Sequence, residues 1–494
     1  MSEASSDENS EPLIVRDCGI ELHPDAGRVI TRLFVPGRED VGPGDSRAAG
    51  VTTRLMALDE DDVETAVSEL KTRFADRHRE FDRTVSTHSA VASATLAADA
   101  VLSPARRWLL GAAFTHEYAV EAAALCNPSI VVRPDAPADQ PGEFLLSMRG
   151  IGEGHISSLS FRTGRVDAAG NVSVDDAARW AETGVTTPGR HHRRAFHVRL
   201  AERDDDYENA AYVLDALPEQ FDSDELQERI RILAGEVSTR RNIATTTSHL
   251  MAMSASSYEV EFAPDTELSE RVLWPATPAE HRGIEDARFV RFTDGDRCTY
   301  YATYTAFDGD NTSIQLLETT DFRRFASVPL VGSAARGKGM ALFPRKIGGR
   351  YAALTRADRE TNGLAYSDDL CCWTDWETIQ EPVSSWEVLQ LGNCGSPIET
   401  ERGWLVLTHG VGAMRTYSLG AILLDLEEPH RVIARTAEPL LTPTAGRRDG
   451  YVPNVVYSCG ALAHGDVLVV PYAVADRYIA IATVSISALL ATMR

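Results

Sequence analysis

The chain has 494 residues, with 49 lysines and arginines against 73 aspartates and glutamates, and a formal charge of −24. This charge argues against non-specific nucleic-acid binding, which requires a basic surface. No run of about 18 apolar residues is present, so we expect no contact with a membrane. The acidic first residues lack the apolar core of a signal peptide, and the seven cysteines show no paired CxxC spacing. We therefore expect a cytoplasmic protein with reduced thiols.

The first quarter of the sequence predicts a helical module. Residues 1–12 are acidic and polar and predict a disordered tail. Residues 29–35 form a short apolar stretch that is typical of an edge strand. Between about residues 56 and 125, apolar side chains recur every three or four positions, and glycine and proline are almost absent. Ser103 and Pro104 are a typical N-cap and first residue of one of these helices. We assign 13–126 to an N-terminal segment with this module.

From Asn127 onward the apolar pattern changes to a period of two. Short strands with turn signals between them fill residues 127–164 and resume from Arg288 to the C-terminus. An insert at about 165–265 interrupts them. It contains the basic cluster 190–194, which we interpret as a solvated surface loop, and a helix over 222–235. The sequence therefore predicts a mainly β domain over 127–494.

The strands are short and closely spaced, with no helices between them, which favours an all-β assembly. A Ser/Thr-x-Asp pattern follows two apolar strands, at Asp321 and again at Asp369. This spacing agrees with the period of about 40–50 residues per propeller blade. The β segments suffice for about five blades, with the long insert between the first two. Polar residues at strand ends would then meet at a central channel.

The strongest local signal is the adjacent pair Glu285 and Asp286, flanked by Arg282 and Arg288. Neighbouring side chains of an extended strand point to opposite faces, so we expect only one carboxylate to face a cavity. Composition alone favours a surface ion-pair cluster here, and such clusters are common.

A second signal is the stretch 336–344, in which Arg336 and Lys338 alternate with glycines before an apolar strand. Such a loop can approach an anion closely. The chain has 3 lysines and 46 arginines, so a lysine retained here indicates a compact charge that arginine does not replace. Isolated polar residues also end several predicted strands: Arg149, Arg356, His409, Tyr417 and Asp476. Motifs for metal, triad or nucleotide chemistry are absent, so we expect no metal and no cofactor.

These motifs occur together with further matching stretches: 127–129, 146–149, 283–288, 336–344, 354–356, 403–411, 417–429, 450–456 and 472–476. In this order they resemble glycoside hydrolase family 130, the inverting β-mannoside phosphorylases and β-mannosidases. The resemblance covers about 55% of the chain and implies a five-bladed β-propeller. The helical module and the insert are not typical of the shorter members of this family.

The resemblance implies a role for each matching residue. Asp286 would be the catalytic acid and would pass its proton through the 3-hydroxyl of a bound mannose. Inorganic phosphate would attack the opposite face of the sugar, as inversion requires. The implied phosphate-binding residues are Arg336, Lys338, Arg356, His409 and Tyr417. The implied substrate-binding residues are Asn127, Arg149, Glu285, Arg288 and Asp476.

Three positions depart from the family pattern: Ala287 replaces a usual proline, Gly339 an aspartate and Gln390 a lysine. We expect phosphorolysis of β-manno-oligosaccharides to α-mannose 1-phosphate, with phosphate as co-substrate, because the Arg/Lys/His set is retained. An inverting β-mannosidase that hydrolyses β-1,2-mannosides is the first alternative. A non-catalytic carbohydrate-binding propeller is the second. We also expect a homo-oligomer.

Overall fold

The computed structural model describes residues 14–38, 46–96, 100–134, 142–202, 207–235 and 242–494. The predicted acidic tail therefore lies outside the described residues. The chain divides into two compact units, of which the smaller comprises Asp25–Ala122 and Ala178–Glu182. The larger comprises Met1–Pro24, Ala123–Ala177 and Thr183–Arg494. Across the described ranges, no helix is both long and apolar enough to span a membrane.

The smaller unit contains the helical module. Its helices are α1 (Arg47–Met56), α2 (Glu60–Phe74), α3 (Phe81–Ala92) and α4 (Pro104–Ala113). Ser103 caps α4 as predicted, because its hydroxyl accepts a hydrogen bond from the backbone N–H of Arg106. The module differs from the prediction at its end. The chain leaves the helix at Ala113 and forms β3 (Thr115–Ala119), which pairs antiparallel with β2 (Val29–Leu33).

The larger unit is mainly β and is built from consecutive antiparallel meanders. The first contains β4 (Ala124–Val132), β5 (Glu143–Ile151), β6 (Ser157–Val166) and β7 (Val172–Val174). The second contains β14 (Gly283–Asp294), β15 (Arg297–Phe307), β16 (Thr312–Thr319) and β17 (Arg324–Pro329). Between them lie β8 (Glu182–Thr183), β9 (Val185–Pro188), β12 (Tyr258–Glu261) and β13 (Arg271–Leu273). Strand β12 extends the second meander by pairing with β17.

Two further meanders follow in chain order. One contains β18 (Ala341–Leu342), β19 (Tyr351–Thr355), β20 (Asn362–Ser367) and β21 (Asp375–Gln380). The other contains β22 (Gln390–Asn393), β23 (Ile398–Thr400), β24 (Gly403–Gly412), β25 (Thr416–Leu424) and β26 (Val432–Arg435). All ten residues of β24 are buried, which agrees with its nearly continuous apolar sequence.

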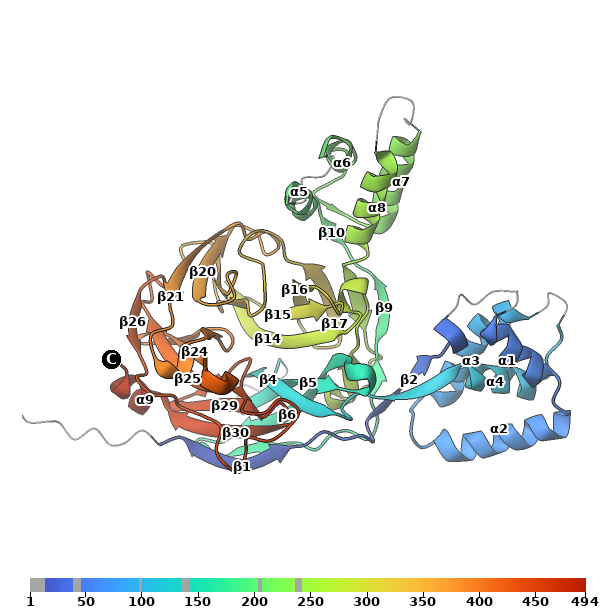
Figure 1. Ribbon diagram of the computed structural model, residues 1–494, viewed down its shortest axis with the longest axis horizontal. Coiled ribbons are helices and arrows are strands. Elements are labelled where there is room, and N and C mark those ends of the chain that lie inside the picture. The colour runs from blue at the N-terminus through green and yellow to red at the C-terminus, as the bar shows by residue number, and fades with distance from the viewer. Residues whose placement is uncertain (1–13, 39–45, 97–99, 135–141, 203–206, 236–241) are drawn as a thin grey trace, which may run out of the picture. The chain divides into compact units, whose positions relative to one another are not determined.

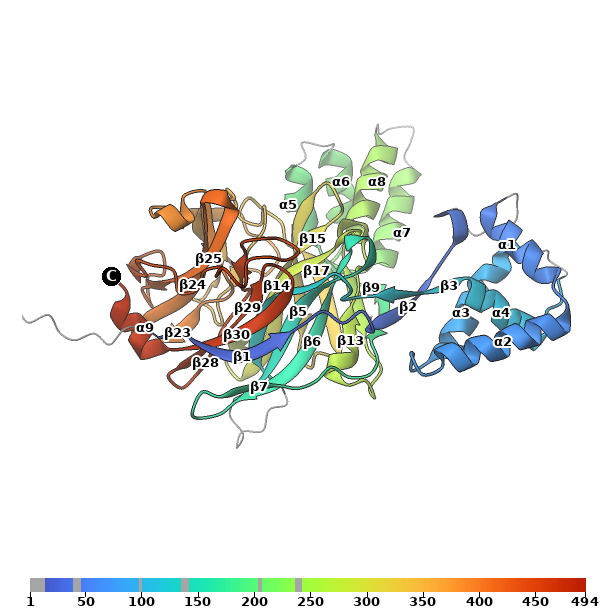
Figure 2. The same ribbon diagram turned by 60° about the horizontal axis from the view of Figure 1, so that its bottom comes forward.

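The last meander joins both ends of the described chain. It contains β27 (Val456–Tyr457), β28 (Leu462–His464), β29 (Val467–Val474) and β30 (Tyr478–Ser485), before helix α9 (Ile486–Thr492). Strand β1 (Arg16–Leu22) pairs antiparallel with β30, and Figure 2 shows the two side by side. Residues 16–22 therefore belong to the β unit, whereas the sequence pattern places them in the N-terminal segment.

Figure 1 shows these five meanders following one another around a common centre, in the colour order cyan, yellow-green, gold, orange and red. Apolar clusters fill the space between neighbouring meanders. One cluster joins the first two through packed rings, among them Phe161, Phe289 and Phe322. Another joins the fourth and fifth through residues such as Leu407 and Val470. This packing fixes the strand ends that carry the polar residues described below.

The insert is helical, with α5 (Arg193–Ala201), α6 (Tyr207–Leu214), α7 (Ser223–Ala234) and α8 (Ile243–Ser254) beside the short strands β10 (His191–His192) and β11 (Gln220–Phe221). Helix α7 is the helix predicted over 222–235, and Asp222 and Glu225 form its capping box. The prediction of a solvated loop at 190–194 is wrong in part: Arg190 and Arg194 are exposed, but the segment forms β10 and the start of α5. His191 is 1% exposed because its ring packs against Phe196 and Phe221 at 5.5 and 5.3 Å.

Candidate active site

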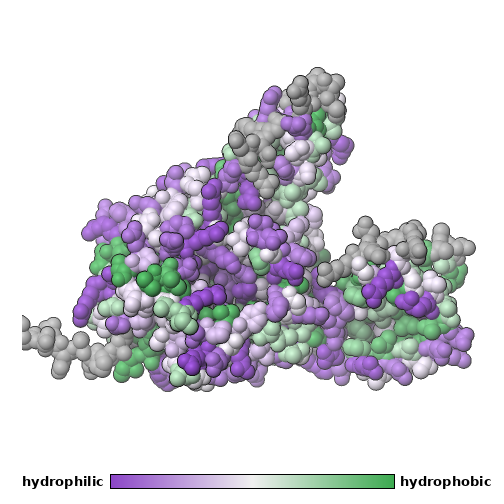
Figure 3. All heavy atoms as spheres, viewed as in Figure 1, coloured by the Kyte–Doolittle hydropathy of each residue, from purple (hydrophilic) through white to green (hydrophobic). Residues whose placement is uncertain are grey.

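A polar cavity of about 680 Å³ lies where the meanders converge, and residues of their strands or adjoining loops line it. Figure 3 shows hydrophilic side chains gathered around a hollow in this part of the larger unit. One side of the cavity, which we call the carboxylate end, contains Asn127, Arg149, Glu285, Asp286, Lys338 and Asp476. The other side, which we call the arginine end, contains Arg356, His409 and Tyr417, with Arg288 behind them.

The charges of the carboxylate end are paired with one another. Glu285 accepts a bond of 2.6 Å from Arg149 Nη2 and another of 2.6 Å from Lys338 Nζ. Asp286 Oδ1 accepts a bond of 2.5 Å from Asn127 Nδ2 and lies 3.4 Å from Arg149 Nη1. Glu285 is 6% exposed. The interpretation of this pair as a surface ion-pair cluster is therefore wrong.

Both carboxylates line the cavity, which contradicts the expectation that only one would. The reason is local backbone geometry. The β14–β15 register shifts between Glu285 and Arg288, and Asp286 has a φ of 55°, so the strand does not alternate there. Asn127 shows the same combination on β4, with a register shift and a φ of 49°. Left-handed backbone at a non-glycine residue is strained, and such strain concentrates at functional sites.

The two aspartates of this end have opposite pKa shifts. Burial raises the pKa of Asp286, but Arg149, Arg288, Lys338 and the bond from Asn127 together lower it below its ordinary value. Asp286 is therefore ionised at neutral pH in this state, although the implied role of general acid requires it to carry a proton. Burial raises the pKa of Asp476 to about 7, against the opposing effect of Arg149.

Among the residues that the structure describes, three buried polar atoms at the carboxylate end lack a hydrogen-bond partner: Asn127 Oδ1, Arg149 Nε and Asp476 Oδ1. Buried polar groups in folded proteins are almost always hydrogen-bonded, so these atoms indicate a missing partner. The set includes both donors and acceptors. A ligand rich in hydroxyl groups satisfies such a set because each hydroxyl donates and accepts.

Within the described residues, Arg288 and Arg356 of the arginine end form no ion pair with a carboxylate. Arg356 donates to the backbone oxygens of Leu391 and Arg359 at 2.9 and 2.8 Å. Arg288 donates to the Asp286 backbone oxygen at 3.1 Å and to Tyr457 Oη at 2.7 Å. Gly392 is required here, because a Cβ at this position would lie 2.3 Å from Arg356 Cδ and 2.6 Å from His409 Cε1.

His409 lies between these arginines and two tyrosines. Burial lowers its pKa well below 6.5, and Arg356 and Arg288 lower it further, so the ring is neutral. Tyr417 stacks on the ring at 6.0 Å, and Tyr457 meets it edge-on at 4.9 Å. Two buried guanidinium groups, a neutral imidazole and two phenols form an environment suited to an anion with several oxygen atoms.

Comparison with known proteins identifies the family to which the chain belongs. A family model described as beta-1,4-mannooligosaccharide phosphorylase matches residues 242–494, just over half of the chain. A 1,2-beta-oligomannan phosphorylase of a Thermoanaerobacter species is 39% identical over 220 residues, which are 44% of this chain and 72% of that protein. The chain belongs to glycoside hydrolase family 130. The sequence resemblance to this enzyme family is thus confirmed.

Other members of family 130 match over similar ranges. A beta-1,2-mannobiose phosphorylase of Listeria innocua is 34% identical over 225 residues, 44% of this chain and 62% of that protein. A solved structure of a Listeria innocua enzyme of that name, in complex with beta-1,2-mannobiose, aligns over 76% of this chain and 92% of that chain. Its TM-score is 0.47, with 23% sequence identity.

Within this family-130 chain, the structure brings together all but one of the predicted site residues. Asn127 and Arg149 lie outside the residues matched by the family model, yet they contact Asp286 directly. Lys338 was predicted to bind phosphate, but its ammonium group contacts Glu285 at the carboxylate end. Arg336 does not line the cavity. Its side chain is 63% exposed and lies 3.5 Å from Glu202, which caps α5.

Several cavity residues escaped the sequence analysis: Arg359, Gln390 as a lining residue, Arg415, Tyr451 and Tyr457. Tyr457 follows the matched stretch 450–456 directly, so its position was the available signal. Arg415 lies in the β24–β25 turn with a φ of 54°, and no sequence pattern predicts this left-handed backbone. Gly339 has a φ of 88° and lies beside Arg356, and this left-handed backbone favours glycine at the position.

Proposed function

We propose that this family-130 chain cleaves β-mannosides by phosphorolysis with inversion, giving α-mannose 1-phosphate and a shortened acceptor. The observation that carries the proposal is the arrangement of the cavity. The unpaired cations of the arginine end lie beside Asp286 and the unpartnered polar atoms of the carboxylate end. The named relatives are mannoside phosphorylases, which supports the same reaction.

In this proposal the mannose ring occupies the carboxylate end. Its hydroxyl groups satisfy Asn127 Oδ1, Arg149 Nε and Asp476 Oδ1, the three atoms without partners. Glu285, held by Arg149 and Lys338, keeps the guanidinium of Arg149 in place. Phosphate occupies the arginine end, bound by Arg356, His409 and Tyr417. The Nη1 group of Arg356 is available for it, since Nε and Nη2 contact backbone oxygens.

Asp286 acts as the general acid through the mannose 3-hydroxyl. Asp286 protonates that hydroxyl, and the hydroxyl passes its own proton to the glycosidic oxygen as the bond to C1 breaks. A phosphate oxygen forms the new bond to C1 on the opposite face. The hydrogen phosphate dianion supplies the proton that replaces the one Asp286 gave. The reaction therefore balances without a further co-reactant.

The low pKa of Asp286 in this state fits a reaction in which phosphate binds before Asp286 takes up its proton. Arg149, Arg288 and Lys338 hold the carboxylate ionised while the cavity contains no anion. A phosphate dianion at the arginine end adds negative charge within a partly desolvated cavity and raises the pKa of Asp286. Phosphate binding would then both supply the nucleophile and protonate the acid.

The fold proposal accompanies the function. We propose that the meanders are the blades of a five-bladed propeller, with β1 completing the last blade through its pairing with β30. The insert then lies between the first two blades. The alignment of the polar strand ends around one cavity supports this assignment.

The first test is product formation from β-1,2- and β-1,4-mannobiose, with and without phosphate. We propose the β-1,2 linkage as the preferred one because the named relatives act on it. Mannose 1-phosphate that forms only when phosphate is present supports the proposal. Cleavage at the same rate without phosphate would instead establish the hydrolytic alternative.

A further inference from the structure

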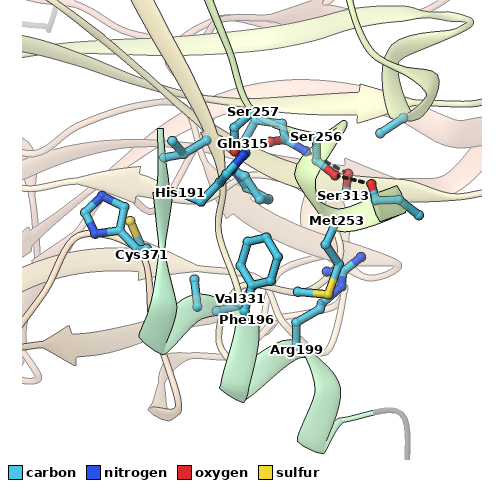
Figure 4. Close-up of a pocket in the computed structure, with 16 residues that line it drawn as sticks. His191, Phe196, Arg199, Met253, Ser256, Ser257, Ser313, Gln315, Val331 and Cys371 are labelled. Atoms are coloured by element: carbon cyan, nitrogen blue, oxygen red, sulfur yellow. Dashed lines mark hydrogen bonds between the residues drawn. The ribbon is translucent and has the colours of Figure 1, made fainter. Parts of the chain in front are cut away.

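A smaller pocket of the larger unit lies between the helical insert and the second meander. Figure 4 shows His191, Phe196 and Gln315 in its lining. Its volume is about 90 Å³, which is too small for a sugar ring, whereas the polar cavity has about 680 Å³. Further groups that bind the ligands of the reaction are therefore expected in the polar cavity.

One arginine of the polar cavity takes no part in the mechanism proposed above. Arg359 lines the cavity from the turn between β19 and β20, and its side chain is exposed. Within the described part of the chain, its guanidinium group forms no ion pair. The adjacent carboxylate of Asp358 accepts bonds from the backbone N–H groups of Glu360 and Thr361, both at 3.0 Å, and from the Thr361 hydroxyl at 2.6 Å. The turn thus uses Asp358 for its own structure.

The backbone of this turn is tied to Arg356. The N–H of Arg359 donates to the backbone oxygen of Arg356 at 2.9 Å, and the Arg359 carbonyl oxygen accepts the bond from Arg356 Nη2 at 2.8 Å. Arg359 has a φ of 71°, a conformation that is uncommon for a residue other than glycine. The carbonyl oxygen of Glu360 accepts from the Leu391 N–H at 3.0 Å. These bonds hold the turn so that Arg356 and Arg359 line the same cavity.

The neighbouring glycine loop leaves space for the Arg359 side chain. Gly337 lines the cavity with a φ of 75°. A Cβ at Gly337 would lie 3.1 Å from the Arg356 backbone oxygen and 3.5 Å from Arg359 Cγ. Arg336 of the same loop lies 3.5 Å from Glu202 and does not line the cavity. Arg359, and not Arg336, is therefore the arginine that lines the cavity beside this loop.

The position of Arg359 favours phosphate over the sugar as its ligand. Arg415 is another exposed arginine of the cavity, but it belongs to the carboxylate end: burial raises the pKa of Asp476, and Arg415 counteracts this rise. Arg359 is joined instead to Arg356 at the arginine end. Two like charges from one turn repel each other, and a phosphate dianion bound between them removes this repulsion, whereas a neutral sugar does not.

We propose that Arg359 is a further phosphate-binding residue, which contacts phosphate from the open side of the cavity while Arg356 contacts it from the buried side. The inference rests on the proposed function, which places phosphate at the arginine end. The net charge of −24 repels a phosphate dianion at longer range, so a cation on the open side also favours its entry.

Titration calorimetry of inorganic phosphate into the full chain, without sugar, tests this independently of turnover. Arg359→Gln removes the charge, and we expect the Kd for phosphate to rise by about three- to tenfold, the effect of one partly exposed charged contact. Arg359→Lys keeps the charge and should keep most of the affinity. Added salt should weaken phosphate binding more in the unmodified chain than in Arg359→Gln.

Arg350→Gln is the matched control for the loss of one positive charge. Arg350 directly precedes β19, at the other end of that strand from Arg359, and it pairs with Asp368 on the surface. Its substitution changes the net charge equally without touching the cavity, so we expect the Kd for phosphate to stay the same.

The proposal requires weaker phosphate binding in Arg359→Gln and retained binding in Arg359→Lys and Arg350→Gln. Unchanged binding in Arg359→Gln overturns it and leaves the proposed phosphorolysis in place. An equal loss in Arg350→Gln also overturns it, because net charge alone would then explain the effect. Phosphate binding that depends on Arg359, in a chain that releases no mannose 1-phosphate, would refute only the proposed reaction. Absence of phosphate binding to the unmodified chain would refute both.

Discussion

The two ends of the cavity hold their charges in different ways. At the carboxylate end, Arg149 and Lys338 are paired with Glu285, and Asp286 is bonded by Asn127. At the arginine end, the hydrogen bonds of Arg288 and Arg356 within the described residues go to carbonyl and phenol oxygens. Paired charges leave little net attraction for an ion and suit a neutral, hydroxyl-rich ligand. Unpaired buried cations suit an anion, because the anion compensates a charge that is otherwise costly to bury.

The largest expected effect on catalysis comes from removing the proposed general acid, Asp286. Asp286→Asn keeps the side-chain shape and its contact with Asn127, but it supplies no proton. We expect kcat for phosphorolysis to fall by about 10³-fold or more, within the range for loss of a general acid. Steady-state kinetics with mannobiose would measure this. An Asp286→Asn variant with near-normal kcat would show that another group is the acid.

The second prediction concerns the pH dependence of the free energy of unfolding, to which Asp476 and Asp286 contribute with opposite sign. The pKa of Asp476 is raised to about 7 in the fold, above its unfolded value of about 4. Its contribution to stability is therefore fully present below about pH 4 and is lost as the pH rises through about 7. Asp476→Asn should remove this loss and raise the free energy of unfolding at pH 8 by up to about 4 kcal/mol relative to the unmodified chain.

Urea unfolding of both proteins at pH 4 and pH 8 measures the difference. Asp286 has the opposite sign, because its lowered pKa contributes stability that is lost as the pH falls through that value. An Asp476→Asn variant whose stability relative to the unmodified chain is the same at both pH values would contradict the raised pKa.

The third prediction concerns the arginine end. Arg356→Gln removes a charge that has no carboxylate partner, so the KM for phosphate should rise by about 10- to 100-fold. The KM for mannobiose should change much less, because the carboxylate end is intact. Arg350→Gln is the matched control, since Arg350 pairs with Asp368 on the surface. If Arg356→Gln raised both KM values equally, phosphate and mannobiose would not bind at separate ends of the cavity.

The smallest expected effect comes from Gln390, which lines the cavity near Tyr417. Gln390→Lys adds a cation on the side where phosphate is proposed to bind. We expect the KM for phosphate to fall by about two- to fivefold, the usual size of a partly screened charge effect. Phosphate titrations of initial rates would detect it. A rise in this KM would show that phosphate does not approach Gln390.

Much of the fold was accessible from the sequence because it depends on local signals. Apolar alternation marked the strands, and Asp222 with Glu225 marked the start of α7. The pairing of β1 with β30 was not accessible, because it joins segments at opposite ends of the chain. The strand β3 was missed for a similar reason: its partner β2 lies more than 80 residues earlier in the sequence.

The sequence predicted most of the residues of the site but not how their side chains are arranged. Ordinary strand alternation predicts that Glu285 and Asp286 face opposite ways, and only the bulge at Asp286 brings both into the cavity. Arg336 was predicted from its glycine-flanked motif, but its contact with Glu202 depends on the insert, which the motif does not include. His191 was predicted to be solvated from its basic neighbours, whereas two aromatic rings determine its burial.

Cleavage of β-1,2-mannobiose in ¹⁸O-labelled water, at several phosphate concentrations, tests the central claim most directly. The account predicts that the released sugar is α-mannose 1-phosphate without ¹⁸O at C1, at a rate that vanishes when phosphate is removed. Mannose carrying ¹⁸O at C1, formed at a rate independent of phosphate, would contradict it. That result would mean that water attacks the sugar and that the arginine end does not bind the nucleophile.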